Sequence, residues 1–358
     1  MLRMWRSALA GAAAAFLSLG AALAAPEPTA HDYLIKDFRF RSEETLPELK
    51  IRYHTLGTPK TDASGKVVNA VLILHGTGGT GRQFTNPLFA DVLFTPGGLL
   101  DPAKYFIVMP DNIGHGGSSK PSDGLRAKFP KYDYADMVAA QHALVTKGLN
   151  VDKLRLIMGT SMGCMHGFVW AETYPTAAKA LMPLACQPVE IAGRNRLWRR
   201  MAIEAITSDP VYQGGDYTAQ PVQGLKTAAD LLILAGAAPV PMQAQLPTRA
   251  AVDEWLGREL PRRVAGMDAN DFIYQVDSSR TYDPSKDLEK IIAPTTWVNS
   301  ADDFINPPEL GIAEAAARRM KTTRYVLIPT SLEARGHGTH THAALWKGEL
   351  EALLKRSE

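Results

Sequence analysis

Six short, continuous apolar runs constrain the fold of this chain more than any other feature. They occupy residues 70–74, 105–109, 154–158, 180–185, 295–298 and 325–328, and Gly, Pro, Asn or Asp bounds them. Runs of this kind are typical of strands that are buried on both faces of a parallel sheet. Segments with apolar residues at helical spacing, 133–149 and 310–320, separate some of these runs. Residues 343–354 are predicted to form the last helix. The alternation predicts an α/β fold with a mostly parallel, doubly wound sheet.

Two segments depart from this rhythm. Residues 33–53 alternate charged and apolar side chains, which predicts an antiparallel hairpin at the edge of the sheet. Residues 188–290 contain helical patterns and several prolines but no clear buried strand. A structureless loop of that length is improbable, so we expect a helical lid inserted into an α/β domain made of residues 25–187 and 291–358.

The N-terminus has the pattern of a signal peptide, predicted here as residues 1–24. Arg3 and Arg6 precede an uncharged stretch rich in Ala and Leu, and Ala22 and Ala24 are small residues at the two positions that signal peptidase reads. A transmembrane anchor is the alternative, but the stretch is rich in weakly apolar Ala and prolines follow it at once. We therefore expect export to the periplasm or the medium, with no stable membrane insertion after cleavage.

Composition excludes several classes of protein. With 39 Lys and Arg against 37 Asp and Glu, and no basic run, nucleic acid is not expected as a partner. Two cysteines, Cys164 and Cys186, are too few for a disulfide scaffold or a four-thiolate zinc site. We expect them to be buried thiols, with a disulfide as the alternative in an oxidising compartment.

The sharpest local motif is the pentapeptide GTSMG at 159–163, between an apolar run and the helical stretch 164–174. A serine on a tight strand-to-helix turn projects its hydroxyl out of the sheet, and glycines two residues to either side let strand and helix pack closely around it. The backbone N–H of Met162 would then point from a helix N-terminus toward an oxyanion. Ser161 is therefore the predicted nucleophile.

A glycine-rich segment, HGTGG at 75–79, follows the first buried strand and could supply a second oxyanion donor. We expect the N–H of Thr77, or otherwise that of Gly76, to serve. Two alternatives compete with this interpretation. GTGGTG at 76–81 matches the dinucleotide fingerprint, with Asp101 placed for a ribose contact, but the residues that follow are a poor start to a crossover helix. The segment could also be a purely structural turn.

The base and the acid should follow the serine in the order acid, then histidine. The loop after 295–298 contains Asp302 and Asp303, and the loop after 325–328 contains His337 between two glycines. We expect His337 to be the base and Asp302 the acid, because two apolar residues follow Asp302 after one spacer and would anchor the loop. Asp303 is the alternative acid.

The GHGTHTH segment at 336–342 contains three histidines and has two alternative interpretations. It could bind a metal ion, or it could be a solvated loop without a role in the site. Neither a helical or strand spacing nor a further acidic ligand accompanies them, so we expect no metal. His340 and His342 are predicted to support the site or lie at the surface. Away from this segment, we expect His115 to be a turn residue and His166 a packed core residue. No organic cofactor is required.

The chain resembles the α/β-hydrolase superfamily and, within it, the homoserine O-acetyltransferase-like family, from about residue 46 to the C-terminus. The likeness rests on SMGCM at 161–165, WAETYP at 170–175, FP at 129–130, DMVAAQ at 136–141, AI at 202–203, DP at 209–210 and DAN at 268–270. The resemblance implies the α/β-hydrolase fold, with Ser161, Asp302 and His337 as nucleophile, acid and base.

Three departures from that family bear on the substrate. Cys164 stands where the family has a second glycine, and the oxyanion segment is closer to that of ordinary esterases. Gly338 stands where the family's acetyltransferases have an aspartate for the ammonium group of their substrate. An exported enzyme would also lack acetyl-CoA. We therefore expect a serine hydrolase that cleaves a carboxylic ester or a related acyl compound as its small-molecule substrate. O-acetyl transfer from acetyl-CoA is the alternative, and a non-catalytic binding protein is the remaining one.

Overall fold

The fold is known from a computed structural model that describes residues 24–358, and it is built on one eight-stranded sheet. The strand order is β1-β2-β4-β3-β5-β6-β7-β8. The strands are β1 (Thr29–Arg39), β2 (Thr45–Leu56), β3 (Ala70–Leu74), β4 (Phe106–Pro110), β5 (Leu156–Thr160), β6 (Leu181–Leu184), β7 (Thr295–Ser300) and β8 (Thr323–Ile328). Each of the six apolar runs coincides with one of the strands β3 to β8, to within two residues.

The pairing of the strands confirms the predicted sheet. β1 and β2 form an antiparallel hairpin, and β2 pairs antiparallel with β4. All pairs from β4 through β8 are parallel. The hairpin is longer than the segment 33–53 that the alternating pattern marked, because β1 begins at Thr29 and β2 ends at Leu56. The chain thus has the mostly parallel sheet of an α/β-hydrolase fold.

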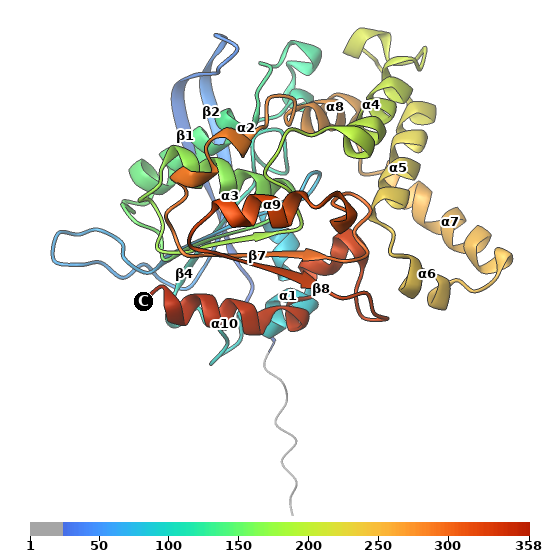
Figure 1. Ribbon diagram of the computed structural model, residues 1–358. Helices are drawn as coiled ribbons and strands as arrows, with labels where there is room; N and C mark the ends of the chain where they lie inside the picture. Colours follow the sequence, from blue (N-terminus) through green and yellow to red (C-terminus); the bar gives the residue numbers. More distant parts are fainter. Residues whose placement is uncertain (1–23) are drawn as a thin grey trace, which may run out of the picture.

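Helices cover both faces of the sheet (Figure 1). α1 and α10 lie against one face, and α2, α3 and α9 lie against the other. The bounds are α1 (Pro87–Leu93), α2 (Tyr134–Ala143), α3 (Met162–Thr173), α4 (Gly193–Thr207), α5 (Val222–Gly236), α6 (Pro239–Gln245), α7 (Arg249–Val264), α8 (Ala269–Asp277), α9 (Ile312–Arg319) and α10 (Lys347–Arg356). This is the layering that short parallel strands joined by helical crossovers produce.

Strand β3 shows how the two layers are filled. Leu72 and Leu74 belong to the core on the α3 side, whereas Val71 and Ile73 belong to the core on the α1 and α10 side. All of these side chains are fully buried. Alternate residues of a strand point to opposite faces, so a strand that is covered on both faces must be apolar throughout. The continuous apolar runs in the sequence have this origin.

The interval between β6 and β7 holds the five helices α4 to α8, and within the described residues it contains no strand. These helices have a small core of their own, built around Ile206, Leu225 and Phe272. α8 ties this lid to the main domain, since Tyr274 Oη donates a 2.6 Å hydrogen bond to the Phe129 carbonyl. α6 and α7 extend farthest from the sheet (Figure 1). The lid therefore stands beside the carboxyl ends of the parallel strands.

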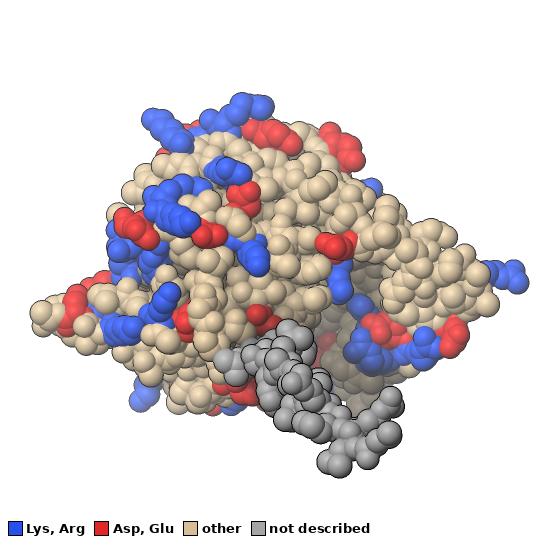
Figure 2. Space-filling view, turned by 90° about the horizontal axis from the view of Figure 1, so that it is seen from below, with Lys and Arg blue, Asp and Glu red and all other residues tan. Residues whose placement is uncertain are grey.

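Two further expectations concern the ends and the surface of the molecule. The predicted signal peptide lies outside the described residues except for Ala24. Within residues 24–358, no single helix is long and apolar enough to cross a membrane. In the same part of the chain, only α5 and α6 taken together have the required length and apolar composition, and a bend of 108° separates them. Positive and negative side chains are interspersed over the face shown in Figure 2. The balance of charge in the sequence is thus also seen locally on that face.

One half-buried carboxyl on α3 makes stability depend on pH. Burial, and then the charges of Asp287 and Asp283, raise the pKa of Glu172 to about 7 from an ordinary value of 4.5. Between these two pH values the folded protein keeps a proton that the unfolded chain releases, so the free energy of unfolding falls as pH rises. We expect Glu172→Gln to stabilise the protein by about 1 kcal/mol at pH 8, allowing for solvent screening, and by almost nothing at pH 4. Urea unfolding at both pH values checks this, and an equal effect at both would contradict it.

Candidate active site

Ser161 lies on a sharp turn between β5 and α3. Its backbone has φ 53° and ψ −111°, a left-handed conformation that is strained for a residue other than glycine. A Cβ atom on Gly159 would lie 2.0 Å from the Gly163 carbonyl oxygen, and one on Gly163 would lie 2.0 Å from the Leu74 carbonyl oxygen. Both glycines are therefore required for the turn, which places the serine as the GTSMG motif predicts.

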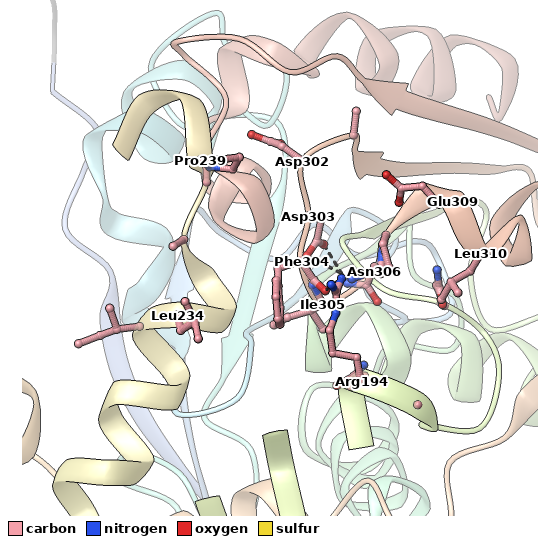
Figure 3. Close-up of a pocket in the computed structure, with 18 of the residues that line it drawn as sticks. Arg194, Leu234, Pro239, Asp302, Asp303, Phe304, Ile305, Asn306, Glu309 and Leu310 are labelled. Carbon is pink, nitrogen blue, oxygen red and sulfur yellow. Dashed lines mark hydrogen bonds between the residues drawn. The ribbon is translucent and has the colours of Figure 1, made fainter. Parts of the chain in front are cut away.

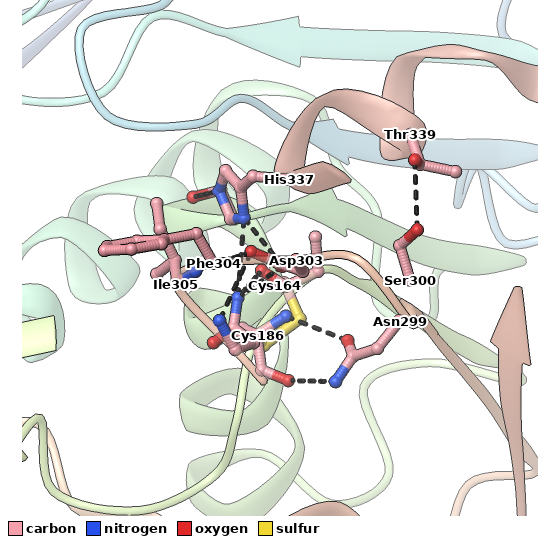
Figure 4. Close-up of polar contacts among 12 residues, drawn as sticks. Cys164, Cys186, Asn299, Ser300, Asp303, Phe304, Ile305, His337 and Thr339 are labelled. Atoms are coloured by element: carbon pink, nitrogen blue, oxygen red, sulfur yellow. Dashed lines mark hydrogen bonds and ion pairs between the residues drawn. A yellow bond between two sulfur atoms is a disulfide. The ribbon is translucent and has the colours of Figure 1, made fainter. Parts of the chain in front are cut away.

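Three side chains from distant parts of the chain form a hydrogen-bonded relay. His337 Nε2 lies 2.8 Å from Ser161 Oγ, and His337 Nδ1 lies 2.9 Å from Asp303 Oδ2. The serine comes from the β5 turn, the carboxylate from the loop after β7 and the imidazole from the loop after β8. Figure 4 shows His337 above Asp303, with the connecting bonds drawn. This arrangement can remove a proton from the serine hydroxyl and stabilise the resulting imidazolium.

The carboxylate in this relay is Asp303, so the choice of Asp302 was wrong. Asp302 Oδ1 accepts a 2.6 Å hydrogen bond from Ser300 Oγ, and no hydrogen bond joins Asp302 to His337. The turn decides between the two. Asp303 Oδ1 accepts hydrogen bonds from the backbone N–H groups of Ile305 and Asn306 at 2.8 and 3.2 Å, which turns the chain around this carboxylate and directs it inward. The apolar residues expected to anchor the loop are only half-buried.

Asp303 is 2% exposed, and its surroundings keep it ionised. Burial by itself pushes the pKa of this carboxyl upward, but the imidazole of His337 and the hydrogen bond from Asn306 outweigh burial and hold the pKa below its ordinary value. Asn306 Nδ2 donates to Asp303 Oδ2 at 2.9 Å and to the Ala185 carbonyl at 3.1 Å. Asn306 thus braces the carboxylate, and nothing in the sequence distinguished it beyond its position in the same loop.

The backbone groups expected to bind an oxyanion border the serine. A Cβ atom on Gly76 would lie 3.3 Å from Ser161 Cβ, so the loop after β3 runs directly beside the hydroxyl. The Gly76 N–H donates to Gln83 Oε1 at 3.3 Å, whereas no hydrogen bond from the N–H of Thr77 or Met162 is found within residues 24–358. The N–H groups of Thr77 and Met162 therefore remain free of other partners within the described residues, and their binding of an oxyanion stays a prediction.

The dinucleotide interpretation of the loop after β3 has no support in the local structure. A 3₁₀ turn, Gly81–Thr85, follows the loop, and α1 begins only at Pro87. The Asp101 carboxylate accepts hydrogen bonds from the N–H groups of Gly97 and Ala103 at 2.7 and 2.8 Å, so it closes a local turn. The glycines therefore do not lead into a helix that could receive a pyrophosphate.

The remaining histidines have other environments. The rings of His340 and His337 are 5.5 Å apart and nearly perpendicular, and burial lowers the pKa of His340 to about 3, so it is neutral. His342 Nδ1 lies 3.2 Å from the Glu333 carbonyl oxygen. Within residues 24–358, His, Cys, Asp and Glu side chains form no cluster of three or more with metal-site geometry.

His115 and His166 are both fully buried. His115 Nδ1 donates to the Ile113 carbonyl at 3.0 Å, which fits the predicted turn residue. His166 packs its ring against Tyr134 with the ring centres 4.7 Å apart, and Gln141 Nε2 lies 3.1 Å from its Nδ1. Burial lowers the pKa of both imidazoles. They belong to the interior behind the site.

A disulfide joins Cys164 to Cys186, which corrects the expectation of two free thiols. Cys164 lies on α3 three residues after Ser161, and Cys186 follows β6. The backbone of Cys186 is bonded on both sides to Asn299, whose Oδ1 accepts from its N–H and whose Nδ2 donates to its carbonyl. Figure 4 shows the sulfur–sulfur bond near Asp303, below His337 in this view. The disulfide connects α3, which follows the nucleophile, to the segment after β6. In that segment the Ala185 carbonyl accepts the hydrogen bond from Asn306.

Removing this disulfide should lower stability. The bond closes a loop of 22 residues, which in the chain-entropy model corresponds to about 3 kcal/mol. We expect the double variant Cys164→Ala, Cys186→Ala to lose this amount of unfolding free energy in a urea titration without reductant. Reductant should destabilise the wild type and leave the variant unchanged. Equal stability of the two proteins without reductant would contradict the assignment.

Comparison with known proteins agrees with this fold. A family model described as alpha/beta hydrolase fold matches residues 69–332. A probable acyltransferase of Methanothermobacter thermautotrophicus (strain Delta H) is 30% identical over 279 residues, covering 78% of this chain and 84% of the relative. A homoserine O-acetyltransferase of Thermobifida fusca is 27% identical over 299 residues, covering 73% and 77%.

Solved structures show the same fold. Homoserine O-acetyltransferase from Bacillus anthracis superimposes with a TM-score of 0.80 at 20% identity, over 92% of this chain and 98% of that one. An acetylester hydrolase from Corynebacterium glutamicum gives a TM-score of 0.79 at 20% identity, over 91% and 96%. The chain belongs to the α/β-hydrolase family and is similar, within it, to the homoserine O-acetyltransferases.

Proposed function

We propose that this protein is an exported serine hydrolase that cleaves a carboxylic ester through an acyl-enzyme. The observation that carries the proposal is the relay from Ser161 Oγ through His337 to the buried Asp303 carboxylate. A serine hydroxyl is a weak nucleophile unless a positioned base takes its proton, and an imidazole needs an oriented carboxylate to do so efficiently. The serine, the base and the carboxylate are all present here, and each lies within hydrogen-bonding distance of the next.

The reaction follows from the positions of these groups. His337 accepts the hydroxyl proton as Ser161 Oγ attacks the acyl carbon, and Asp303 stabilises the imidazolium. The N–H groups of Thr77 and Met162 bind the oxyanion, and one such donor is worth about 3 kcal/mol in the barrier. His337 then gives the proton to the departing alcohol, and a water molecule releases the acid by the same steps. These steps use only groups of the chain, water and a small acyl substrate.

Water is the proposed acyl acceptor for two reasons. Gly338 follows the base, so this position offers no carboxylate to hold the ammonium group of an amino-acid acceptor. The disulfide at Cys164 and Cys186 supports an oxidising compartment, where acetyl-CoA is not supplied. The names of the curated relatives favour the second candidate, O-acetyl transfer from acetyl-CoA to a hydroxyl acceptor.

Product analysis distinguishes the two candidates. The mature chain is incubated with p-nitrophenyl acetate or acetyl-CoA, each with and without homoserine, and the products are separated by mass spectrometry. Hydrolysis predicts acetate from the ester at a rate that homoserine does not change. O-acetylhomoserine as the main product, above all from acetyl-CoA, would overturn the hydrolase in favour of the transferase.

Export is tested separately. The full chain is produced in a Gram-negative host, and its cell fractions are assayed for ester hydrolysis. The proposal predicts activity in the periplasm or the medium and a mature N-terminus at Ala25. Retention in the cytoplasm with residues 1–24 intact would contradict it.

A further inference from the structure

A large cavity opens beside the relay, between the lid and the loop after β7. Its volume is about 1350 Å³. Figure 3 shows Leu234 and Pro239, from the junction of α5 and α6, on one side of it, and Phe304 and Ile305 on the other. The segment after β6, the start of α4, one side of α7 and the segment that leads into α9 also contribute to the lining. The cavity is larger than the roughly 300–1,000 Å³ that is usual for small-molecule sites, and it far exceeds the space that an acetyl group needs.

The cavity reaches the relay itself. Asp303 and Asn306, the carboxylate and its brace, are among the residues that line it. Met165 also lines it, and this residue lies one helical turn beyond Ser161 on the same face of α3. A Cβ atom on Gly336, the neighbour of the base, would lie 3.3 Å from Ala238, another lining residue. Ser161 and His337 are not themselves among the lining residues, but residues next to both of them are, so a chain bound in the cavity can extend from the neighbourhood of the reacting centre.

The lining is mainly apolar. It includes the side chains of Ile233, Met242, Leu246, Trp255 and Leu256 from the lid. Several lining side chains remain substantially exposed, among them Leu234 at 61% and Leu310 at 60%. An occupant that covers such side chains gains the free energy of burying its own apolar surface and theirs. The occupant favoured by this lining is hydrocarbon.

The charges of the lining disfavour an anionic occupant. Arg194 is the one Lys or Arg among the lining residues, and its guanidinium donates to the Phe304 carbonyl at 2.6 Å and lies 3.8 Å from the centre of the Phe304 ring. Glu190, Asp302 and Glu309 bring negative charge to the same cavity. Phosphate groups need cations with free donors, so this lining disfavours a polyphosphorylated carrier such as acetyl-CoA.

We infer that this cavity holds the aliphatic chain of a neutral ester, so that the enzyme prefers esters with a long chain to acetates of small alcohols. The inference rests on the proposed ester hydrolysis at Ser161 and specifies its substrate class. The chain can belong to the acyl or the alcohol part of the ester, since both parts meet at the carbon that Ser161 attacks.

The test compares esters on the purified mature chain. On the acyl side, p-nitrophenyl octanoate is compared with p-nitrophenyl acetate. On the alcohol side, octyl acetate is compared with ethyl acetate. We expect kcat/KM to rise at least about 50-fold with chain length in one of the two series, because each methylene that is buried contributes up to about fourfold. The series in which the rise occurs identifies which part of the ester enters the cavity.

Two matched variants locate the effect. Val252 on α7 lines the cavity and Val240 on α6 does not, although both are 41% exposed. Val252→Trp should lower kcat/KM for the preferred long-chain ester at least about tenfold more than kcat/KM for p-nitrophenyl acetate, while Val240→Trp should leave the ratio of the two values unchanged. Circular dichroism and thermal melting show whether each variant is folded.

The outcomes separate this inference from the function on which it rests. If the wild type hydrolyses none of these esters, both the proposed hydrolase function and the inferred preference for a long chain are contradicted. Acetate hydrolysis without a rise along either series would overturn the inference alone. Equal losses on short and long esters in Val252→Trp, or the same selective loss in Val240→Trp, would also overturn it.

Discussion

We expect Ser161→Ala to lower kcat/KM for p-nitrophenyl ester hydrolysis by about 10⁵-fold or more. The substitution removes the hydroxyl oxygen that lies 2.8 Å from His337 Nε2, so no acyl-enzyme can form. The backbone at this position stays left-handed, and the variant should melt within a few degrees of the wild type. The measurement is the steady-state rate with circular dichroism as the folding control. A folded variant that keeps a tenth of the activity would contradict the assignment of the nucleophile.

The second large effect distinguishes two adjacent carboxylates. Asp303→Asn should lower kcat by about 10⁴-fold, because an amide in place of the carboxylate favours the wrong tautomer of His337 and cannot stabilise its imidazolium. Asp302→Asn should change kcat by less than about threefold, since Asp302 Oδ1 accepts a hydrogen bond from Ser300 Oγ, whereas His337 is hydrogen-bonded to Asp303. Both variants are measured on p-nitrophenyl acetate, and each serves as the isosteric control of the other. A large loss in Asp302→Asn with Asp303→Asn active would reverse the assignment.

The sequence was sufficient to predict the sheet and two of the three relay residues. Buried parallel strands must be apolar on both faces, so β3 to β8 stood out as continuous runs. Ser161 and His337 could be recognised because glycines flank both residues. At Ser161 these glycines are needed because the backbone packs too closely there for a Cβ atom. These features are properties of short segments, which is why a single sequence displays them.

The acid, its brace and the disulfide depend on contacts between segments, and the sequence did not specify them. Asp302 and Asp303 differ by one position, and the turn that Asp303 forms with two following N–H groups decides which one faces His337. Asn306 gains its role by reaching both Asp303 and Ala185. The cysteines pair only because α3 packs beside the end of β6.

The lid illustrates the same limit for specificity. Helical patterns between 188 and 290 predicted an insertion, and five helices occupy that interval. The cavity, however, arises from the bend between α5 and α6 and from the placement of α7 opposite the loop after β7. Periodicity gives the apolar side of each helix but not the partner that this side faces, so the chain-length preference could be inferred only from the structure.

The central claim is that Ser161 is a nucleophile activated by His337 and Asp303. A fluorophosphonate probe tests it most directly, because it reacts covalently with an activated serine. Peptide mapping after brief labelling of the mature chain should place the phosphonyl group on Ser161, with labelling slowed strongly in Asp303→Asn and not in Asp302→Asn. An unlabelled wild type, or a label on another residue, would contradict the account.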